Sequence, residues 1–325
     1  LTVGLDIGSA SIKAVALGPR KGTGPRPLIA KHLVPLTQNQ EADPSEAIKA
    51  AFRELKLPVP VQAVNVGVSG QWVIMRVVEL PTLRPTEMKQ ALPFEAQRSL
   101  PFNIQDVVVD GEILGPAEVG KMWALIVACK KDLLQRRIDW VKQAGLDVAL
   151  IDVDALAVAN GFLAHTDGRR AKGTHAILNI GAQLTSLVIF QGTIPYLVRD
   201  IPWGADKLSR HVGEQVGTDP AVVKEQLLKP ESTPDFLGAM KVASEVLATD
   251  VQLSFDYFEN RFGCPPDEIL VSGGLGQSAS FLEALATHFT QAITAWTPLN
   301  GLSGQFAVAY GLAHRNLSRG DLDEL

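Results

Sequence analysis

The sequence has little of what marks secreted, membrane-spanning or nucleic-acid-binding proteins. Only two of its 325 residues are cysteine, too few for a disulfide framework, and no signal peptide is visible, so we expect a reducing, cytoplasmic environment. No stretch approaches the roughly 18 consecutive apolar residues of a membrane span. The richest run, residues 124–129, has the length of a buried strand. A net charge of −5 gives no basis for binding nucleic acid or an anionic membrane surface.

The remaining composition is that of a folded protein with sizeable cores. Apolar residues make up 46% of the chain, which excludes a disordered protein, and a prior of about 150 residues per domain suggests two domains. Strand-like and helix-like segments alternate, which favours the α/β class. The predicted strands are residues 2–8, 12–17, 61–68, 72–80, 107–114, 122–129, 147–152, 175–180, 184–190 and 268–272. The predicted helices are residues 43–55, 86–99, 131–144, 153–164, most of 204–258, 279–289 and 303–315, with Pro93 expected to kink or split the second.

Two similar strand–turn–strand segments carry the candidate chemistry. Leu5-Asp6-Ile7-Gly8 begins the first, and Leu178-Asn179-Ile180-Gly181 begins the second. This similarity predicts duplicated domains that face each other across a cleft. The glycines permit tight turns whose N–H groups bind phosphate, and Asp6 is placed to hold Mg²⁺ through water. Two ordinary β-hairpins remain the alternative, and Lys13 is either a phosphate contact or a solvent-exposed lysine.

A third segment supports nucleotide binding. Residues 268–278 combine a strand, the glycine pair Gly273-Gly274 and the start of a helix. A strand–glycine–helix junction is a common docking place for nucleotides, since the free N–H groups of a helix start attract anions. The segment is neither a Walker loop nor a dinucleotide-binding fingerprint.

Together these segments resemble the actin/Hsp70/sugar-kinase superfamily. Residues 6–13 resemble its first phosphate motif, 179–185 its second and 271–278 its adenosine motif, while 152–159 and 305–311 resemble its two connecting helices. The resemblance implies a two-domain actin-like fold that binds ATP and Mg²⁺. The implied nucleotide-binding residues are Asp6, Gly8, Ser9, Ala10, Ser11, Lys13, Asn179, Gly181, Ala182, Gln183, Thr185, Gly273, Gly274 and Gln277.

Within that superfamily the chain resembles the PilM family of type IV pilus assembly proteins. The specific matches are residues 68–81, which contain Ser-Gly and end in Leu-Pro, the Phe-Glu-Ala and Leu-Pro-Phe stretch at 94–102, and the strand at 104–110. The implied first-domain core comprises 1–76, 151–173 and 303–315. An α+β insertion, ferredoxin-like or similar, occupies residues 77–150. The second domain comprises residues 174–302, and residues 316–325 form a polar tail. The main domain boundary is expected at the basic stretch 167–173.

The family resemblance also implies partners. The chain would be a cytoplasmic ATP-binding scaffold that binds the N-terminal tail of a PilN-like membrane protein, meets platform and motor components, and reaches the bacterial inner membrane only through a partner. We expect the tail to bind in a groove between the insertion and the first-domain body, with Phe102 as an aromatic anchor. The expected groove residues are Pro81, Leu83, Phe94, Leu100, Pro101 and Phe102.

Asn179 departs from the superfamily pattern, which has aspartate at this position. An amide carries no charge and is not a useful base, so we expect very slow or absent ATP hydrolysis. Asp154 is interpreted as a helix-initiating residue, with a site role as the alternative.

Three other functions remain open. The chain could be an FtsA-like division protein, although its short acidic tail is not an amphipathic membrane helix. The other two are a component of a related secretion system and a small-molecule kinase.

Overall fold

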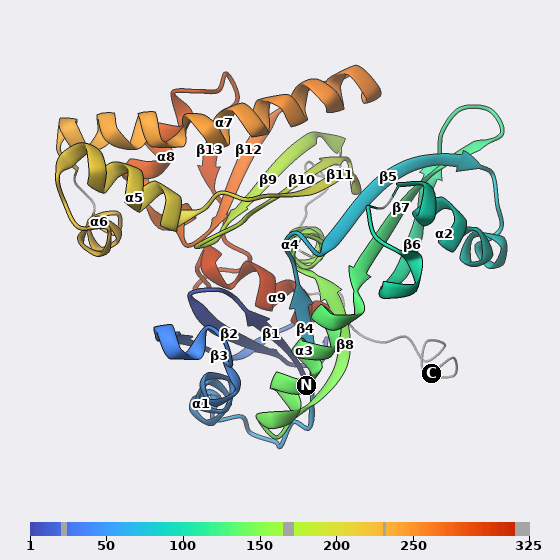
Figure 1. The fold of residues 1–325 in the computed structure, drawn as a ribbon, viewed down its shortest axis with the longest axis horizontal. Coiled ribbons are helices and arrows are strands. Elements are labelled where there is room, and N and C mark those ends of the chain that lie inside the picture. Colours follow the sequence, from blue (N-terminus) through green and yellow to red (C-terminus); the bar gives the residue numbers. More distant parts are fainter. Residues whose placement is uncertain (21–24, 100, 165–171, 230–231, 316–325) are drawn as a thin grey trace.

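The computed structural model describes residues 1–20, 25–99, 101–164, 172–229 and 232–315. Two mixed five-stranded sheets and one smaller sheet organise these residues (Figure 1). Three predictions fall wholly or partly outside the described residues: the boundary stretch 167–173, the groove residue Leu100 and the polar tail 316–325.

The first sheet has the order β3-β2-β1-β4-β8. Its strands are β1 (Thr2–Ile7), β2 (Ser11–Leu17), β3 (Leu28–Pro35), β4 (Ala63–Val68) and β8 (Asp147–Val153). Helices α1 (Ser45–Leu55) and α3 (Lys131–Gln143) pack on one face, where Ile48 and Val141 join the core of β1 and β4. Helix α9 (Ala307–His314) packs against β1 and β2 from the other side. Because both faces are covered, β1 and β4 are almost wholly apolar.

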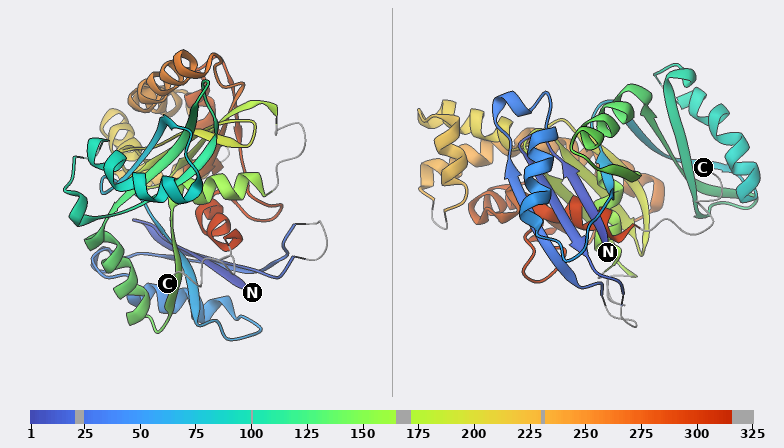
Figure 2. Two further views of the ribbon diagram at one scale, coloured as in Figure 1. Left: turned by 90° about the vertical axis from the view of Figure 1, so that its right-hand side faces the viewer. Right: turned by 90° about the horizontal axis from the view of Figure 1, so that it is seen from below.

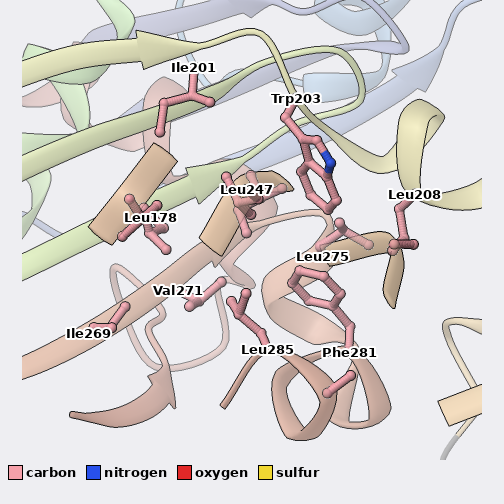
Figure 3. Close-up of a cluster of buried hydrophobic side chains, with 14 of the residues drawn as sticks. Leu178, Ile201, Trp203, Leu208, Leu247, Ile269, Val271, Leu275, Phe281 and Leu285 are labelled. Carbon is pink, nitrogen blue, oxygen red and sulfur yellow. The ribbon is translucent and has the colours of Figure 1, made fainter. Parts of the chain in front are cut away.

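The second sheet has the order β11-β10-β9-β12-β13. Its strands are β9 (Thr174–Ile180), β10 (Thr185–Gln191), β11 (Ile194–Ile201), β12 (Glu268–Gly273) and β13 (Ala292–Ala295). Helices α5 (Ala205–Val216), α6 (Pro220–Gln226), α7 (Pro234–Phe262) and α8 (Ala279–Ala286) provide the remaining buried partners of this core. Figure 3 shows how Trp203, Leu247 and Phe281 meet β9 and β12 there.

A three-stranded antiparallel sheet of order β5-β7-β6 lies to one side of these domains (Figure 2). It comprises β5 (Val73–Pro81), β6 (Val107–Pro116) and β7 (Lys121–Lys130), with α2 (Pro85–Ser99) on one face. We call residues 73–130 the inserted subdomain. Residues 131–150 of the predicted insertion instead supply α3 and most of β8, and β8 pairs with β4 of the first sheet. We therefore propose that the insertion spans 73–130 rather than 77–150.

Helix α4 (Asp154–Leu163) and α9 lie between the two large sheets, as the predicted connecting helices should (Figure 1). The helices approach closely at glycine: a Cβ on Gly311 would lie 1.7 Å from the carbonyl oxygen of Ala157. Gly161 is packed less tightly, because a Cβ there would lie 3.2 Å from a ring carbon of Tyr310. The two glycines therefore set the distance between the helices that join the domains.

The sequence-based assignment differs from the structure at six elements. Strands β3, β11 and β13 were missed, because β3 and β13 have mostly half-exposed or exposed side chains and lack a continuous apolar run. Helix α2 is continuous through Pro93, so the expected split is wrong, whereas the alternative of a kink stays a prediction. Helix α1 begins at Ser45, where the Asp43 carboxylate accepts the Ser45 N–H at 3.0 Å. Helix α8 ends at Ala286 rather than at 289.

Candidate functional site

The two hairpins identified in the sequence face one cavity between the large sheets. The β1–β2 turn contributes Gly8 to Ser11, and the β9–β10 turn contributes Gly181 to Leu184, to a cavity of about 330 Å³ that we call the central cavity. Each turn is closed by a similar bond: Gly8 N–H donates to the Ser11 carbonyl at 3.2 Å, and Gly181 N–H donates to the Leu184 carbonyl at 2.9 Å. The structural repeat therefore matches the sequence repeat.

The two hairpins differ in charge. Asp6 lies opposite Lys13 in the β1–β2 register, and the Lys13 ammonium lies 3.0 Å from the Asp6 carboxylate with both side chains largely buried. In the second hairpin Asn179 lies opposite Ser186, and its Oδ1 accepts a hydrogen bond from Ser272 Oγ at 3.1 Å. The first hairpin thus brings an ion pair to the cavity and the second brings neutral groups.

The glycine pair after β12 has two distinct roles. Gly273 has a φ of +82°, and a Cβ there would lie 2.2 Å from the Ile180 carbonyl oxygen, so the residue allows β12 to turn against β9. Gly274 has helical backbone angles, lines the central cavity and has no atom within 4 Å of the place of a Cβ. Gly273 is therefore structural, whereas Gly274 leaves open space at the cavity wall.

Most predicted nucleotide-binding residues line the central cavity, but three do not. Gly273 and Gln277 are not among its lining residues. The fully buried Thr185 donates its hydroxyl to the Trp203 carbonyl at 2.8 Å and so anchors the second hairpin to the segment before α5. The eleven that line it are Asp6, Gly8, Ser9, Ala10, Ser11, Lys13, Asn179, Gly181, Ala182, Gln183 and Gly274.

The central cavity has further lining residues that were not among the predicted nucleotide-binding residues. Helix α5, helix α6 and the residues that follow α6 supply an ion pair and apolar side chains, and η5 (Gly304–Phe306) and α9 supply one residue each. Lys224 lies 2.6 Å from Asp206. The further lining residues are Ser69, Asp154, Leu184, Ser186, Ala205, Asp206, Lys224, Leu227, Leu228, Leu275, Ser278, Gln305 and Val308.

Asp154, for which a site role was the alternative interpretation of the sequence, has the clearest chemistry of these residues. It is the first residue of α4, as a helix-initiating residue should be, and it also lines the central cavity. Its Oδ1 is shielded from solvent and has no hydrogen-bond partner among the described residues. Gly67 makes room for this oxygen, because a Cβ there would lie 1.9 Å from it. Gly67 within the apolar strand β4 is a further local signal of this arrangement.

Burial and the nearby charge of Asp6 raise the pKa of Asp154 to about 7. A hydrogen bond with Ser69 and the charge of Arg137 oppose this rise. Arg137 reaches the cluster from α3, where its Nη1 donates to the Ile7 carbonyl at 2.7 Å. The apo protein therefore holds two carboxylates, Asp6 and Asp154, close enough to disfavour the ionisation of Asp154.

This pKa predicts how stability changes with pH in metal-free protein. The folded state binds the Asp154 proton more tightly than an unfolded chain with the ordinary value of 3.8, so this stabilisation is complete below about pH 4 and is lost as pH rises to about 7. Asp154→Asn should therefore raise the melting temperature at pH 8 by about 2 °C or more, and by less at pH 5. Thermal denaturation in EDTA measures both, with the exposed Asp147→Asn as the control. An equal gain at the two pH values would contradict the assignment.

The structure does not gather the six predicted groove residues around one cavity. Phe94 is 70% exposed on α2, Leu83 packs toward the buried face of that helix, and Pro81 ends β5. The Phe102 ring lies 6.0 Å from Trp72, with the Lys130 ammonium 4.7 Å above it. Pro101 borders a different groove beside β5 and β11, and Leu100 lies outside the described residues.

A cavity of about 440 Å³ does lie between the inserted subdomain and the first-domain body. We call it the α4 groove. Apolar side chains of β7, α3 and α4, among them Val127, Leu134 and Leu156, line its floor. Its charged lining residues are Asp110 and Glu112 from β6 and the ion pair between Asp152 and Arg315. None of the described residues of the predicted groove lines this cavity, and the tail groove stays a prediction.

Comparisons with known proteins give one family and a shared fold. A family model described as type IV pilus assembly protein PilM matches residues 4–319. The solved PilM-PilN type IV pilus biogenesis complex is similar, with a TM-score of 0.81, 22% identity, and coverage of 96% of this chain and 97% of that chain.

Two other solved structures show the same fold at lower similarity. The activator of 2-hydroxyisocaproyl-CoA dehydratase from Clostridium difficile, solved with bound ADPNP, has a TM-score of 0.52, 13% identity, and coverage of 99% and 94% of the two chains. A Bacteroides thetaiotaomicron protein described as having an actin-like ATPase fold has a TM-score of 0.50, 9% identity, and coverage of 96% and 95%. The predicted two-domain actin-like fold is thereby confirmed.

Proposed function

The chain belongs to the PilM family of type IV pilus assembly proteins, and we propose that it is an ATP-binding scaffold of the inner-membrane assembly platform. The observation that carries the nucleotide part is the central cavity, where two glycine turns, Gly274 and the carboxylates of Asp6 and Asp154 meet. The family match does not favour a division protein, a secretion-system component or a small-molecule kinase.

The residues present fit Mg·ATP. The two turns and Lys13 suit phosphate oxygens, and the exposed Leu228 at the cavity wall offers an apolar surface to a base. The unpartnered Oδ1 of Asp154 and the carboxylate of Asp6 would hold Mg²⁺ through water, since the described residues contain no cluster of three side-chain ligands for a metal. Bound Mg²⁺ would neutralise phosphate charge and favour ionised Asp154.

We expect very slow hydrolysis, because Asn179 brings no charge to the second hairpin. Asn179→Asp should raise turnover about tenfold or more, since a carboxylate can orient or deprotonate a water. Aspartate can still accept the Ser272 hydroxyl, so the substitution suits the fold. Phosphate release under single-turnover conditions measures the rate. A wild-type turnover above about 1 per second would contradict the proposal, as would an Asn179→Asp variant that is no faster.

We propose that the α4 groove binds the cytoplasmic tail of a PilN-like membrane protein. The apolar floor suits the apolar side chains of a short peptide, and its place matches the groove expected between insertion and first domain. No helix in the described part of the chain combines the length and apolar character needed to cross a bilayer. We therefore propose that the protein is cytoplasmic and meets the inner membrane through this partner.

Leu156→Ala should weaken tail binding about tenfold, which is 1.4 kcal/mol, because it removes the apolar wall that α4 offers to the peptide. Phe102→Ala should leave tail binding unchanged, because the Phe102 ring packs with Trp72 and Lys130 outside the α4 groove. Calorimetric titration of the tail peptide, with Mg·ATP affinity as the folding control, measures both. If instead Phe102→Ala lowered the affinity for the tail peptide about thirtyfold and Leu156→Ala left it unchanged, the groove residues expected from the sequence would be favoured.

A pull-down tests the scaffold role itself. The immobilised N-terminal tail of the neighbouring membrane protein should capture the chain, and the amount captured is compared with and without Mg·ATP. Absence of capture in both conditions would reject the partner proposal and leave the nucleotide proposal intact.

A further inference from the structure

A second groove lies on the other side of the inserted subdomain. It has a volume of about 730 Å³ and runs between β5 of the inserted subdomain and β11 of the second domain, with α7 at its far wall. We call it the β5 groove. In Figure 1 the two strands approach each other where β5 leaves the centre of the molecule.

Both strands that border the β5 groove are edge strands. β5 is the first strand of the order β5-β7-β6, and β11 is the first of the order β11-β10-β9-β12-β13. Within the described residues no ladder joins β5 to β11, and nothing else pairs with their outer sides. An edge strand presents unpaired N–H and C=O groups that accept an additional strand. The groove is therefore bordered by main-chain groups suited to an extended peptide.

The side chains around these edges combine apolar surface with positive charge. Ile74 from β5 and Leu253 and Tyr257 from α7 offer apolar area, and the last two are 59% and 51% exposed. Three arginines, Arg76, Arg199 and Arg261, line the same groove.

None of these arginines forms an ion pair with a described carboxylate. Arg199 Nη1 donates to Ser254 Oγ at 3.0 Å, and the Arg261 guanidinium lies 4.7 Å from the Trp123 ring centroid. The one carboxylate in the lining, Asp200, already accepts Ser186 Oγ at 2.8 Å and the Gly70 N–H at 2.9 Å. Three guanidinium groups thus remain available for acidic partners.

We propose that the β5 groove binds an extended, acidic segment of a partner protein, which pairs with the outer edge of β5 as an added strand. The open edges favour a peptide over a lipid headgroup, because a headgroup has no repeating backbone donors and acceptors. The arginines select acidic side chains. The α4 groove does not, because the one arginine in its lining, Arg315, is already paired with Asp152, and Asp110 and Glu112 add negative charge. The two sides of the inserted subdomain therefore take segments of different charge, and this inference does not depend on tail binding in the α4 groove.

The test uses a phage-displayed library of random nonapeptides selected against the full chain. Phage that bind the wild type are then offered the Arg76→Glu variant, which carries a substitution at an exposed residue. Peptides that bind the wild type but not this variant are synthesised. Their affinities for wild type, Arg76→Glu, Arg261→Gln and Arg210→Glu are measured by fluorescence anisotropy. Arg210 is an exposed arginine of α5 outside the β5 groove, so its variant is the matched control.

We expect peptides with at least two acidic residues among alternating apolar ones. Their affinity should fall about tenfold in Arg76→Glu and in Arg261→Gln, and stay unchanged in Arg210→Glu. Hydrogen–deuterium exchange of β5 should slow when such a peptide binds, which side-chain contacts alone would not cause. The proposal is overturned if every peptide that binds the wild type also binds Arg76→Glu, or if the selected peptides lack acidic residues. It is also overturned if Arg210→Glu weakens peptide binding equally, or if anionic vesicles rather than peptides bind the groove. Arg76→Glu should still bind the PilN-like tail. Measuring that binding shows whether a negative result concerns only the β5 groove or the proposed scaffold role as well.

Discussion

Gly274→Arg is expected to abolish Mg·ATP binding while the protein stays folded. Gly274 has φ −62° and ψ −46°, which any residue adopts, and no atom lies within 4 Å of the place of its Cβ. A long side chain therefore enters the central cavity of about 330 Å³ without straining the backbone. We expect the affinity to fall about a hundredfold or more. The stabilisation of about 2.7 kcal/mol that a ligand provides at 100 times its Kd should then disappear.

Thermal denaturation with and without Mg·ATP measures this effect, and two further variants make it specific. Gly238→Arg adds the same side chain on α7, at another helical glycine with open space around it and outside the cavity. It should keep the full ATP-induced shift. Gly274→Glu should lose the shift as Gly274→Arg does, since both fill the cavity. An undiminished shift in the Gly274 variants would place the nucleotide elsewhere.

Gly311→Ala is expected to destabilise the protein by about 3 kcal/mol or more, or to prevent folding. The added methyl would lie 1.7 Å from the Ala157 carbonyl oxygen, a backbone atom of the facing helix α4. Helices α4 and α9 would have to separate, and both contribute to the core between the sheets. Overpacking that moves backbone elements destabilises cores by this order or more.

The matched control is again on α7. Gly238→Ala is also a glycine-to-alanine change within a helix, but nothing lies within 4 Å of the added methyl. Helix propensity alone should therefore stabilise it by up to about 1 kcal/mol. Urea denaturation of the three proteins gives the free energies of unfolding. If Gly311→Ala were as stable as Gly238→Ala, the close packing of α4 on α9 would be wrong.

The sequence predicted the parts of the central cavity that depend on neighbours along the chain. The turns at Gly8 and Gly181 were predicted because a strand-like segment is followed by a glycine and small residues. These signals are local, so they can be recognised without knowledge of the fold. The seven main helical regions were found for the same reason, since apolar period and terminal residues are local signals. Strand β13 was missed because a short, exposed edge strand has almost no apolar pattern.

The predicted nucleotide-binding roles, the domain limits and the tail groove stay predictions. Phe94 and Phe102 were grouped because they are near in sequence, but Phe94 is exposed on α2 while Phe102 packs against Trp72. Proximity along the chain does not decide which face of a helix or turn a side chain occupies.

By itself, therefore, the sequence determined the turn chemistry, most of the helices and the family. Only the tertiary structure decided which side chains share a site. Asp6 and Asp154 come together because β4 contains Gly67, whose missing side chain leaves space for the Asp154 carboxylate at the start of α4. The β5 groove likewise depends on the tertiary structure, because β5 and β11 are edge strands of two different sheets that lie beside each other only in the folded chain. Such arrangements depend on packing between distant segments, and that packing sets burial, charge proximity and pKa.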